Sequence, residues 1–114
     1  MTSGRLPAHL EVGALVRKIQ GEGDFATVLR KGDPESGSLM LIVESRGRHL
    51  ACLERVLTLS GNYEWQQIGP ADSAGSEEIR SFLAKRRRFD TDLWLIELDI
   101  ADAERFIAET TSKG

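Results

Sequence analysis

The spacing of apolar positions along the chain predicts helices and strands in the order α-β-β-β-β-α-β-α. Segments 6–20 and 76–88 repeat apolar residues every three or four positions, which is typical of helices that lie on a core. A short closing helix is expected after Asp102, which can cap it, with Phe106 and Ile107 facing inward. Strands are expected over 25–31, 39–43, 49–59, 63–68 and 93–98.

The first segment has a strand interpretation as well, because Leu10, Val12, Ala14 and Val16 alternate with other residues. A helix is favoured because Pro7 is suited to a first helical turn, where its missing N–H would have no partner. The glycines that follow residue 20 are typical of a helix end.

Two of the strands are expected in the interior of the sheet. Segment 39–43 is apolar at every position, and segment 93–98 is apolar on both faces until Glu97. Short connections rich in turn residues predict an antiparallel meander for the first four strands. The fold class is therefore α+β, with two to three helices packed on one mixed or antiparallel sheet of about five strands.

Length and composition predict one globular domain over residues 1–114, with 1–5 and 111–114 flexible. Hydrophobic residues make up 40% and charged residues 29% of the chain, which argues against a disordered protein. No apolar run approaches the roughly 20 residues that span a bilayer, so no membrane association is expected. Cys52 is the only cysteine, which fits a reducing compartment, and the expected location is the cytoplasm.

The segment 21–26 matches the letters of the dinucleotide fingerprint G-x-G-x-x-A. That fingerprint needs a strand before the glycines and a helix after them, so that the helix N-terminus meets a pyrophosphate. The order here is reversed, and a helix C-terminus repels phosphate. The glycines are interpreted as a helix end, and no nucleotide cofactor is expected.

No metal site or catalytic nucleophile is expected from the histidines and the cysteine. His49 and Cys52 lack the paired ligand spacing of a structural zinc site, and on a regular strand they point to opposite faces. Cys52 is interpreted as a small core residue. No catalytic residue, metal ligand or cofactor is therefore assigned.

A metal-dependent nuclease is a second, less favoured alternative, because the order of elements is similar to that of restriction-type nucleases. Such sites use an acidic residue two positions before a lysine, and no acidic-x-Lys triplet occurs here. The nearest is Glu44-Ser45-Arg46, and arginine does not replace lysine freely. Four carboxylates near the final strand are able to ligate a metal but are interpreted as turn and strand-end residues: Asp90, Asp92, Glu97 and Asp99.

The second long helix, for which Ser76 is the expected N-cap, ends in a basic run. Five cations against two anions lie between residues 76 and 88. Cations in a last helical turn favour the helix dipole, so a solvated helix end is the default interpretation. The first alternative function is RNA or anion binding through this run. The other basic pairs, Arg30 with Lys31 and Arg46 with Arg48, are not expected to join it. The anion-binding candidates are Arg80, Lys85, Arg86, Arg87 and Arg88.

Three stretches together resemble one small bacterial family. They cover residues 6–12, 25–33 and 86–99, and the last of them, RRRFDTDLWLIELD, is the most specific. The family is domain of unknown function 1491, found mainly in alphaproteobacteria. The resemblance implies a stand-alone cytoplasmic protein of this length, and it implies no activity, cofactor or catalytic residue.

The function that the sequence favours is a non-catalytic cytoplasmic binding or accessory module. Each catalytic template lacks a residue that its chemistry requires. A protein partner is expected, contacted through an edge strand. Trp65, between Glu64 and Gln66 in the expected edge strand 63–68, is the candidate anchor for that contact.

Overall fold

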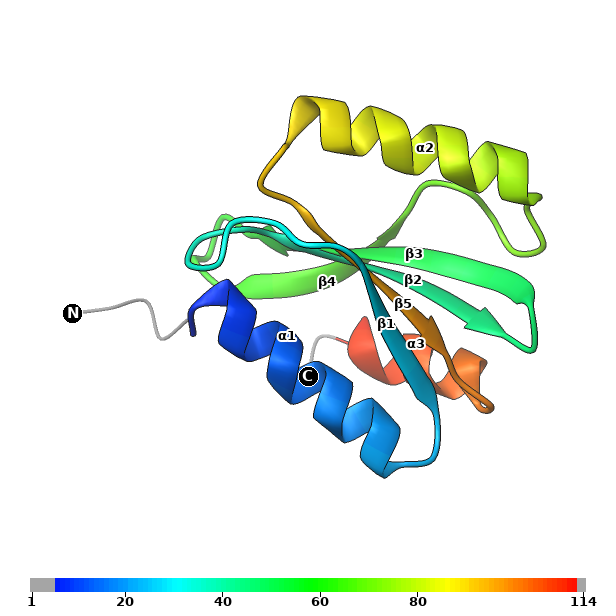
Figure 1. Cartoon of the computed structure of the whole chain (residues 1–114). Coiled ribbons are helices and arrows are strands. Elements are labelled where there is room, and N and C mark those ends of the chain that lie inside the picture. Colours follow the sequence, from blue (N-terminus) through cyan, green and yellow to red (C-terminus); the bar gives the residue numbers. More distant parts are fainter. Residues whose placement is uncertain (1–5, 113–114) are drawn as a thin grey trace.

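The computed structural model describes residues 6–112, which form three helices and a five-stranded sheet (Figure 1). The order of elements and the α+β class confirm the prediction from the sequence. The flexibility expected for residues 1–5 and 111–114 falls largely outside the described range. The elements are α1 (Ala8–Gly21), β1 (Phe25–Arg30), β2 (Leu39–Ser45), β3 (Arg48–Leu57), β4 (Tyr63–Ile68), α2 (Ser76–Phe89), β5 (Trp94–Asp99) and α3 (Ala103–Thr110).

The strands lie in the order β1-β5-β2-β3-β4. Strands β2, β3 and β4 form an antiparallel meander as predicted, and β2 and β5 are parallel. Strand β1 pairs with β5 instead of β2, so the predicted meander is wrong at its first connection. The two strands that are apolar on both faces, β2 and β5, lie in the interior, as predicted.

The connection between β1 and β2 crosses the start of β5 instead of turning back as a hairpin. The backbone N–H of Asp33 donates to the carbonyl oxygen of Asp92 at 3.0 Å. The indole Nε1 of Trp94 donates to the carbonyl oxygen of Asp33 at 2.8 Å. A Cβ atom on Gly32 or Gly37 would lie 2.0 or 2.3 Å from that same Asp92 oxygen, so this crossing requires glycine.

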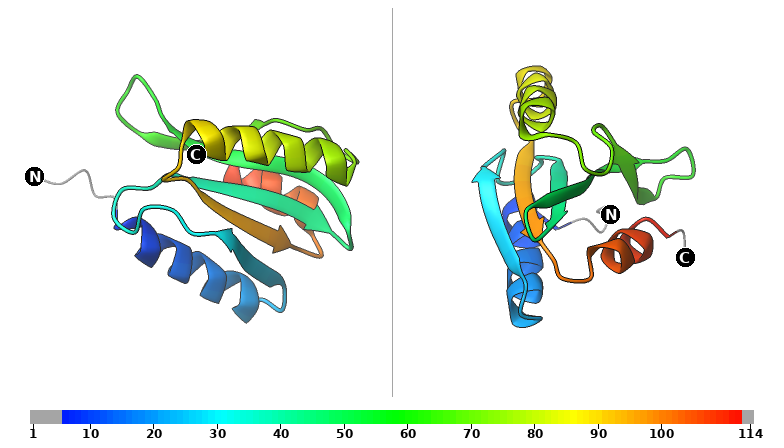
Figure 2. Two further views of the ribbon diagram at one scale, coloured as in Figure 1. Left: turned by 45° about the horizontal axis from the view of Figure 1, so that its top comes forward. Right: turned by 90° about the vertical axis from the view of Figure 1, so that its right-hand side faces the viewer.

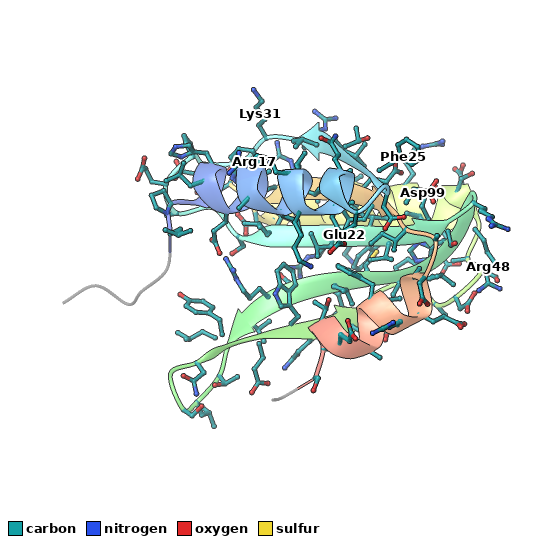
Figure 3. All side chains as sticks on the ribbon, turned by 90° about the horizontal axis from the view of Figure 1, so that it is seen from below. Arg17, Glu22, Phe25, Lys31, Arg48 and Asp99 are labelled. Atoms are coloured by element: carbon teal, nitrogen blue, oxygen red, sulfur yellow. The ribbon has the colours of Figure 1, made fainter. Side chains whose placement is uncertain are left out.

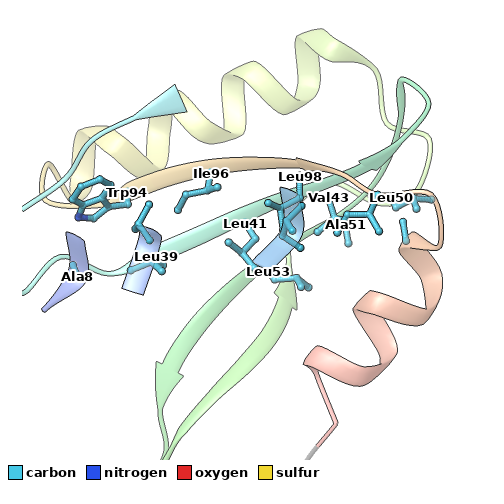
Figure 4. Packing of buried hydrophobic residues seen from close by; sticks show 14 residues of the cluster. Ala8, Leu39, Leu41, Val43, Leu50, Ala51, Leu53, Trp94, Ile96 and Leu98 are labelled. Carbon is cyan, nitrogen blue, oxygen red and sulfur yellow. The ribbon is translucent and has the colours of Figure 1, made fainter. Parts of the chain in front are cut away.

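The helices cover both faces of the sheet, with α1 and α3 on one face and α2 on the other (Figure 2). The larger core lies under α1 and α3 and contains Trp94, which is 6% exposed (Figure 4). Its buried members from the three interior strands are Leu39, Leu41, Val43, Leu50, Ala51, Leu53, Trp94, Ile96 and Leu98. The smaller core, under α2, consists of Met40, Ile42, Cys52, Leu93 and Leu95.

Helix α2 covers its face of the sheet incompletely. None of its residues is fully buried, and Ile79, Phe82 and Leu83 are half-buried against the smaller core. On the uncovered part of this face, Phe25 and Leu29 of β1 are 70% and 43% exposed. A groove between α2 and the β1 edge follows from this incomplete cover.

The helix ends differ in detail from the predictions. Gly75 is the N-cap of α2, and Ser76 is its first helical residue, so the predicted serine cap is wrong. Asp102 stands at the N-cap of α3 as predicted, but its side chain makes no capping hydrogen bond. None of the described helices is long and apolar enough to cross a membrane.

Candidate functional site

The structure divides the basic run of α2 between different environments. Arg86 turns toward the sheet and forms an ion pair with Glu54 of β3. Arg87 donates through Nη1 to two backbone carbonyl oxygens in the turn after the helix, those of Thr91 at 2.6 Å and Leu93 at 2.8 Å. The run is therefore not one continuous basic surface.

Three arginines of α2 instead share a depression with an arginine of β1. Residues 80, 83, 84, 87 and 88 recur at the spacing of one helix face and form one wall of this depression. Its volume is about 480 Å³, and apolar side chains line it together with the four arginines. We call it the arginine depression; it is lined by Leu29, Arg30, Arg80, Leu83, Ala84, Arg87, Arg88 and Leu95.

The participation of Arg30 corrects the expectation that no other basic residue joins the run of α2. Arg30 pairs with Leu95 across the β1–β5 ladder, and β5 follows α2 directly in the chain. The insertion of β5 beside β1 thus brings Arg30 close to α2. The pair Arg46 and Arg48 stays apart from Arg30 and Lys31, as predicted. Lys31 and Arg48 lie toward opposite ends of the sheet (Figure 3).

The acidic residues beside the run do not neutralise the arginine depression. Asp90 accepts a hydrogen bond from the backbone N–H of Asp92 at 3.1 Å. Neither carboxylate forms an ion pair with an arginine within residues 6–112, and the same range gives Arg30 and Arg88 no ion-pair partner. Arg80 lies 3.5 Å from Glu77, an exposed pair that contributes little. The guanidinium groups of Arg30 and Arg88 therefore remain available to an anion, together with the part of the Arg87 guanidinium that does not contact the backbone.

A second pocket, of about 330 Å³, adjoins the arginine depression. The two pockets share Arg80 and Leu83, so they lie next to each other along α2, and together we call them the groove. Two carboxylates, a histidine and several apolar side chains line this pocket. We call it the acidic pocket; it is lined by Ile42, Glu44, Gly47, His49, Ala74, Ser76, Ile79, Arg80, Leu83 and Glu97.

The parallel pairing of β2 with β5 brings the two carboxylates of this pocket together. Glu97 lies opposite Ile42, and Glu44 lies opposite Asp99, all on the α2 side of the sheet. Burial raises the pKa of Glu44 to about 7, and a hydrogen bond with Glu97 and repulsion from Glu97 and Asp99 add to this rise. A carboxyl group that titrates near neutral pH is typical of functional sites.

His49 is the buried polar member of the acidic pocket, and it is 6% exposed. Its Nε2 lies 3.2 Å from the carbonyl oxygen of Pro70, so Nε2 carries the proton, because a carbonyl oxygen only accepts. Its Nδ1 is buried and has no hydrogen-bond partner within the described residues. In the neutral imidazole this nitrogen is an acceptor that lacks a donor.

His49 and Cys52 face the same side of the sheet, so the prediction of opposite faces is wrong. The reason is a β-bulge, because Val43 pairs with Ala51 while the next residue, Glu44, pairs with His49. The extra residue, Leu50, reverses the alternation between positions 49 and 52. Cys52 is a buried core residue as predicted, and burial raises the pKa of its thiol to about 12.

The four carboxylates considered for a nuclease do not converge. Asp90 and Asp92 precede β5, whereas Glu97 and Asp99 lie at its other end. Asp92 and Glu97, the nearest members of the two pairs along the chain, are five positions apart, which is roughly 16 Å at about 3.3 Å for each extended residue. In residues 6–112 no three His, Cys, Asp or Glu side chains are placed to hold a metal ion.

Trp65 lies in the edge strand β4, as predicted, and is half-buried against the larger core. The guanidinium of Arg55 lies 5.5 Å from the centre of its ring and 5.4 Å from that of Tyr63. Arg55 also forms two hydrogen bonds with the carboxylate of Glu11 on α1, at 2.5 and 2.8 Å. The exposed large apolar side chains of this region are Leu57, Leu59 and Tyr63.

A family model described as "Protein of unknown function (DUF1491)" matches residues 6–108. The chain is 28% identical to a DUF1491 family protein from Caulobacter crescentus CB15, whose crystal structure superposes with a TM-score of 0.76 over 90% of this chain and 94% of that one. An NMR structure of a DUF1491 family protein from the same organism gives 28% identity and a TM-score of 0.73, over 86% and 88% of the chains. The solution structure of protein Atu0922 from A. tumefaciens gives 27% identity and a TM-score of 0.69, over 83% of this chain and 86% of that one. No curated protein matches the chain.

Proposed function

The chain belongs to the DUF1491 family, as its sequence resemblance indicates, and we propose that this member is a non-catalytic cytoplasmic binding module for a small organic anion. The proposed site is the arginine depression. The ligand class is a phosphate or carboxylate attached to an apolar group.

The observation that carries this proposal is the meeting of four arginines from two separate elements around one depression. Guanidinium groups match phosphate and carboxylate oxygens with paired hydrogen bonds, and they do so best when several approach one point. The volume of about 480 Å³ lies within the range of small-molecule sites. The apolar side chains of Leu29, Leu83 and Leu95 provide a surface for the uncharged part of a ligand.

A small anion fits this site better than an RNA strand does. A groove for single-stranded nucleic acid combines basic residues with aromatic side chains on which bases stack, and no aromatic residue lines the arginine depression. The protein carries a net charge of −3, and Arg86 is already paired with Glu54. RNA binding through residues 85–88 is therefore the less favoured alternative, and the experiment below tests it as well.

The proposal is tested by titrating the ¹⁵N-labelled protein with phenyl phosphate, inorganic phosphate, phenol and an oligouridylate. We expect phenyl phosphate to shift the backbone signals of Leu29, Arg88 and Leu95 more than phosphate or phenol does. Replacing Arg30 or Arg88 by Gln should weaken binding by about ten- to a hundredfold, because a hydrogen bond to a charged group contributes about 1.5–3 kcal/mol.

Arg17→Gln is the matched control, because Arg17 is an exposed arginine of α1 on the opposite face of the sheet (Figure 3). It should leave the affinity for phenyl phosphate within twofold. Equal weakening by Arg17→Gln and Arg30→Gln would mean that the anion follows overall charge, and the proposal would be wrong. Binding of the oligouridylate alone, with a salt slope of about 0.7 per phosphate, would favour the RNA alternative.

A further inference from the structure

We infer that the acidic pocket is a binding site for the ammonium group of an amine. Nothing in the family description assigns a ligand to these residues. The inference depends on the acidic pocket alone. It extends the proposed function only if one ligand occupies both the acidic pocket and the arginine depression.

The first argument is that the pocket contains an acceptor that its own lining leaves unsatisfied within the described residues, next to a pair of carboxylates. Glu44 and Glu97 bring two carboxylates side by side, and His49 adds the unpartnered Nδ1. A buried acceptor without a donor is destabilising, so a donor that enters the pocket is favoured. An ammonium group carries a positive charge and more than one N–H donor, so it suits a pair of carboxylates with a further acceptor nearby.

The second argument comes from the rest of the lining. Ile42 of β2 and Ile79 and Leu83 of α2 give the pocket an apolar lining beside the acceptors, so the site suits an amine with an apolar carbon chain or ring. A metal ion is the less suitable occupant, because no three metal-ligating side chains converge in residues 6–112. A lone water molecule has two donors and no charge, and it leaves the repulsion between the carboxylates in place.

The arginine depression begins where the acidic pocket ends, at Arg80 and Leu83. An elongated molecule with an amine at one end and an anionic group at the other would complement both halves of the groove. This extension rests on the proposed function, whereas the amine site does not.

Proton release gives the inference a distinctive signature. The charged groups around Glu44 are Glu97 and Asp99 on β5 and Arg80 on α2, and the neighbouring imidazole is that of His49 on β3. An ammonium group favours the ionised form of Glu44, whose pKa is about 7 in the free protein. Since about one tenth of such a carboxyl is ionised at pH 6 and about nine tenths at pH 8, the affinity should rise about tenfold between these values.

The experiment is a calorimetric and NMR titration with benzylamine, with benzyl alcohol as the uncharged analogue of the same shape. We expect benzylamine to shift the backbone signals of Ile42, Glu44 and Glu97, with release of about half a proton at pH 7. Glu44→Gln should weaken binding at least tenfold at pH 8 and abolish the proton release. The matched control Glu22→Gln, at an exposed position after α1, should change neither quantity.

Two further variants separate the possible failures. His49→Phe keeps an aromatic ring but removes Nδ1, and it should weaken benzylamine binding without changing the proton release. Arg30→Gln should leave benzylamine binding within twofold, so failure of the anion proposal is distinguishable from failure of the amine site. Equal shifts by benzyl alcohol and benzylamine, or an unchanged affinity in Glu44→Gln, would overturn the inference.

Discussion

Replacing Glu44 by Gln should change how the stability of this protein depends on pH. In the folded protein the pKa of Glu44 is raised from 4.5 to about 7, first by burial and then by Glu97 and Asp99. Between these two pH values the folded state holds a proton that the unfolded state has lost. The free energy of unfolding should therefore fall as the pH rises from 4.5 to 7, and this contribution should be constant above about pH 8.

The magnitude follows from the size of the shift. A rise of about 2.5 pKa units corresponds to about 3.4 kcal/mol if the carboxyl is shielded from water. Glu44 is only partly buried, so solvent screening reduces this to about 1–2 kcal/mol. Glutamine has nearly the same shape and carries no charge at any pH, so it should remove this penalty. At pH 8 the variant should be about 1–2 kcal/mol more stable than the parent, and at pH 4.5 the two should be equal.

The assay is urea unfolding of both proteins at pH 4.5, 5.5, 6.5, 7.5 and 8.5, followed by tryptophan fluorescence and circular dichroism. Glu78→Gln is the control, because Glu78 is an exposed residue in the first turn of α2. It should lower the stability by a few tenths of a kcal/mol and leave the pH dependence unchanged. If Glu44→Gln keeps the parent's fall in stability between pH 4.5 and 7.5, the reasoning about the acidic pocket is refuted.

Three further predictions concern the fold. Ile42→Asp should abolish cooperative thermal unfolding, because it places a carboxylate in the smaller core next to Glu97; a melting temperature within about 2 °C of the parent would contradict this. Gly32→Ala should cost roughly 2–4 kcal/mol in a urea melt, since its Cβ would lie 2.0 Å from a backbone oxygen, whereas Gly21→Ala, with nothing within 4 Å, should be neutral or slightly stabilising. Arg55→Met should cost about 3 kcal/mol because it removes both hydrogen bonds from Arg55 to the carboxylate of Glu11, at a site only 17% exposed. A double variant with Glu11→Leu should recover most of that loss in a double-mutant cycle.

Part of the candidate site was predictable from local spacing. Arg80, Arg87 and Arg88 share one helix face because positions i, i+7 and i+8 align on any α-helix. Arg86 continues the helical spacing of the apolar face of α2, so its position toward the sheet follows from the sequence. The sequence did not predict its partner, Glu54, because that depends on which strand lies under the end of α2. Arg30 joins the site only through the order of the strands, which local spacing does not encode.

The acidic pocket was not predictable from the sequence. Glu44 and Glu97 are far apart in the chain, and they meet because β2 and β5 pair in parallel with Ile42 opposite Glu97. His49 faces them only because one extra residue in β3 reverses the side-chain alternation. A bulge leaves no reliable mark in the pattern of apolar positions, so the regular alternation gave the wrong face.

The sequence by itself determined the elements, their order and the interior position of β2 and β5. These depend on which residues avoid water, and a strand that is apolar on both faces is stable only when both faces are covered. The tertiary structure alone decided that β5 separates β1 from β2, which helices lie on which face, and that α2 leaves a groove beside β1. Those outcomes depend on contacts between segments that are distant in the chain. Several arrangements of the strands satisfy the same hydrophobic pattern, and close contacts such as that between Gly32 and Asp92 select one of them.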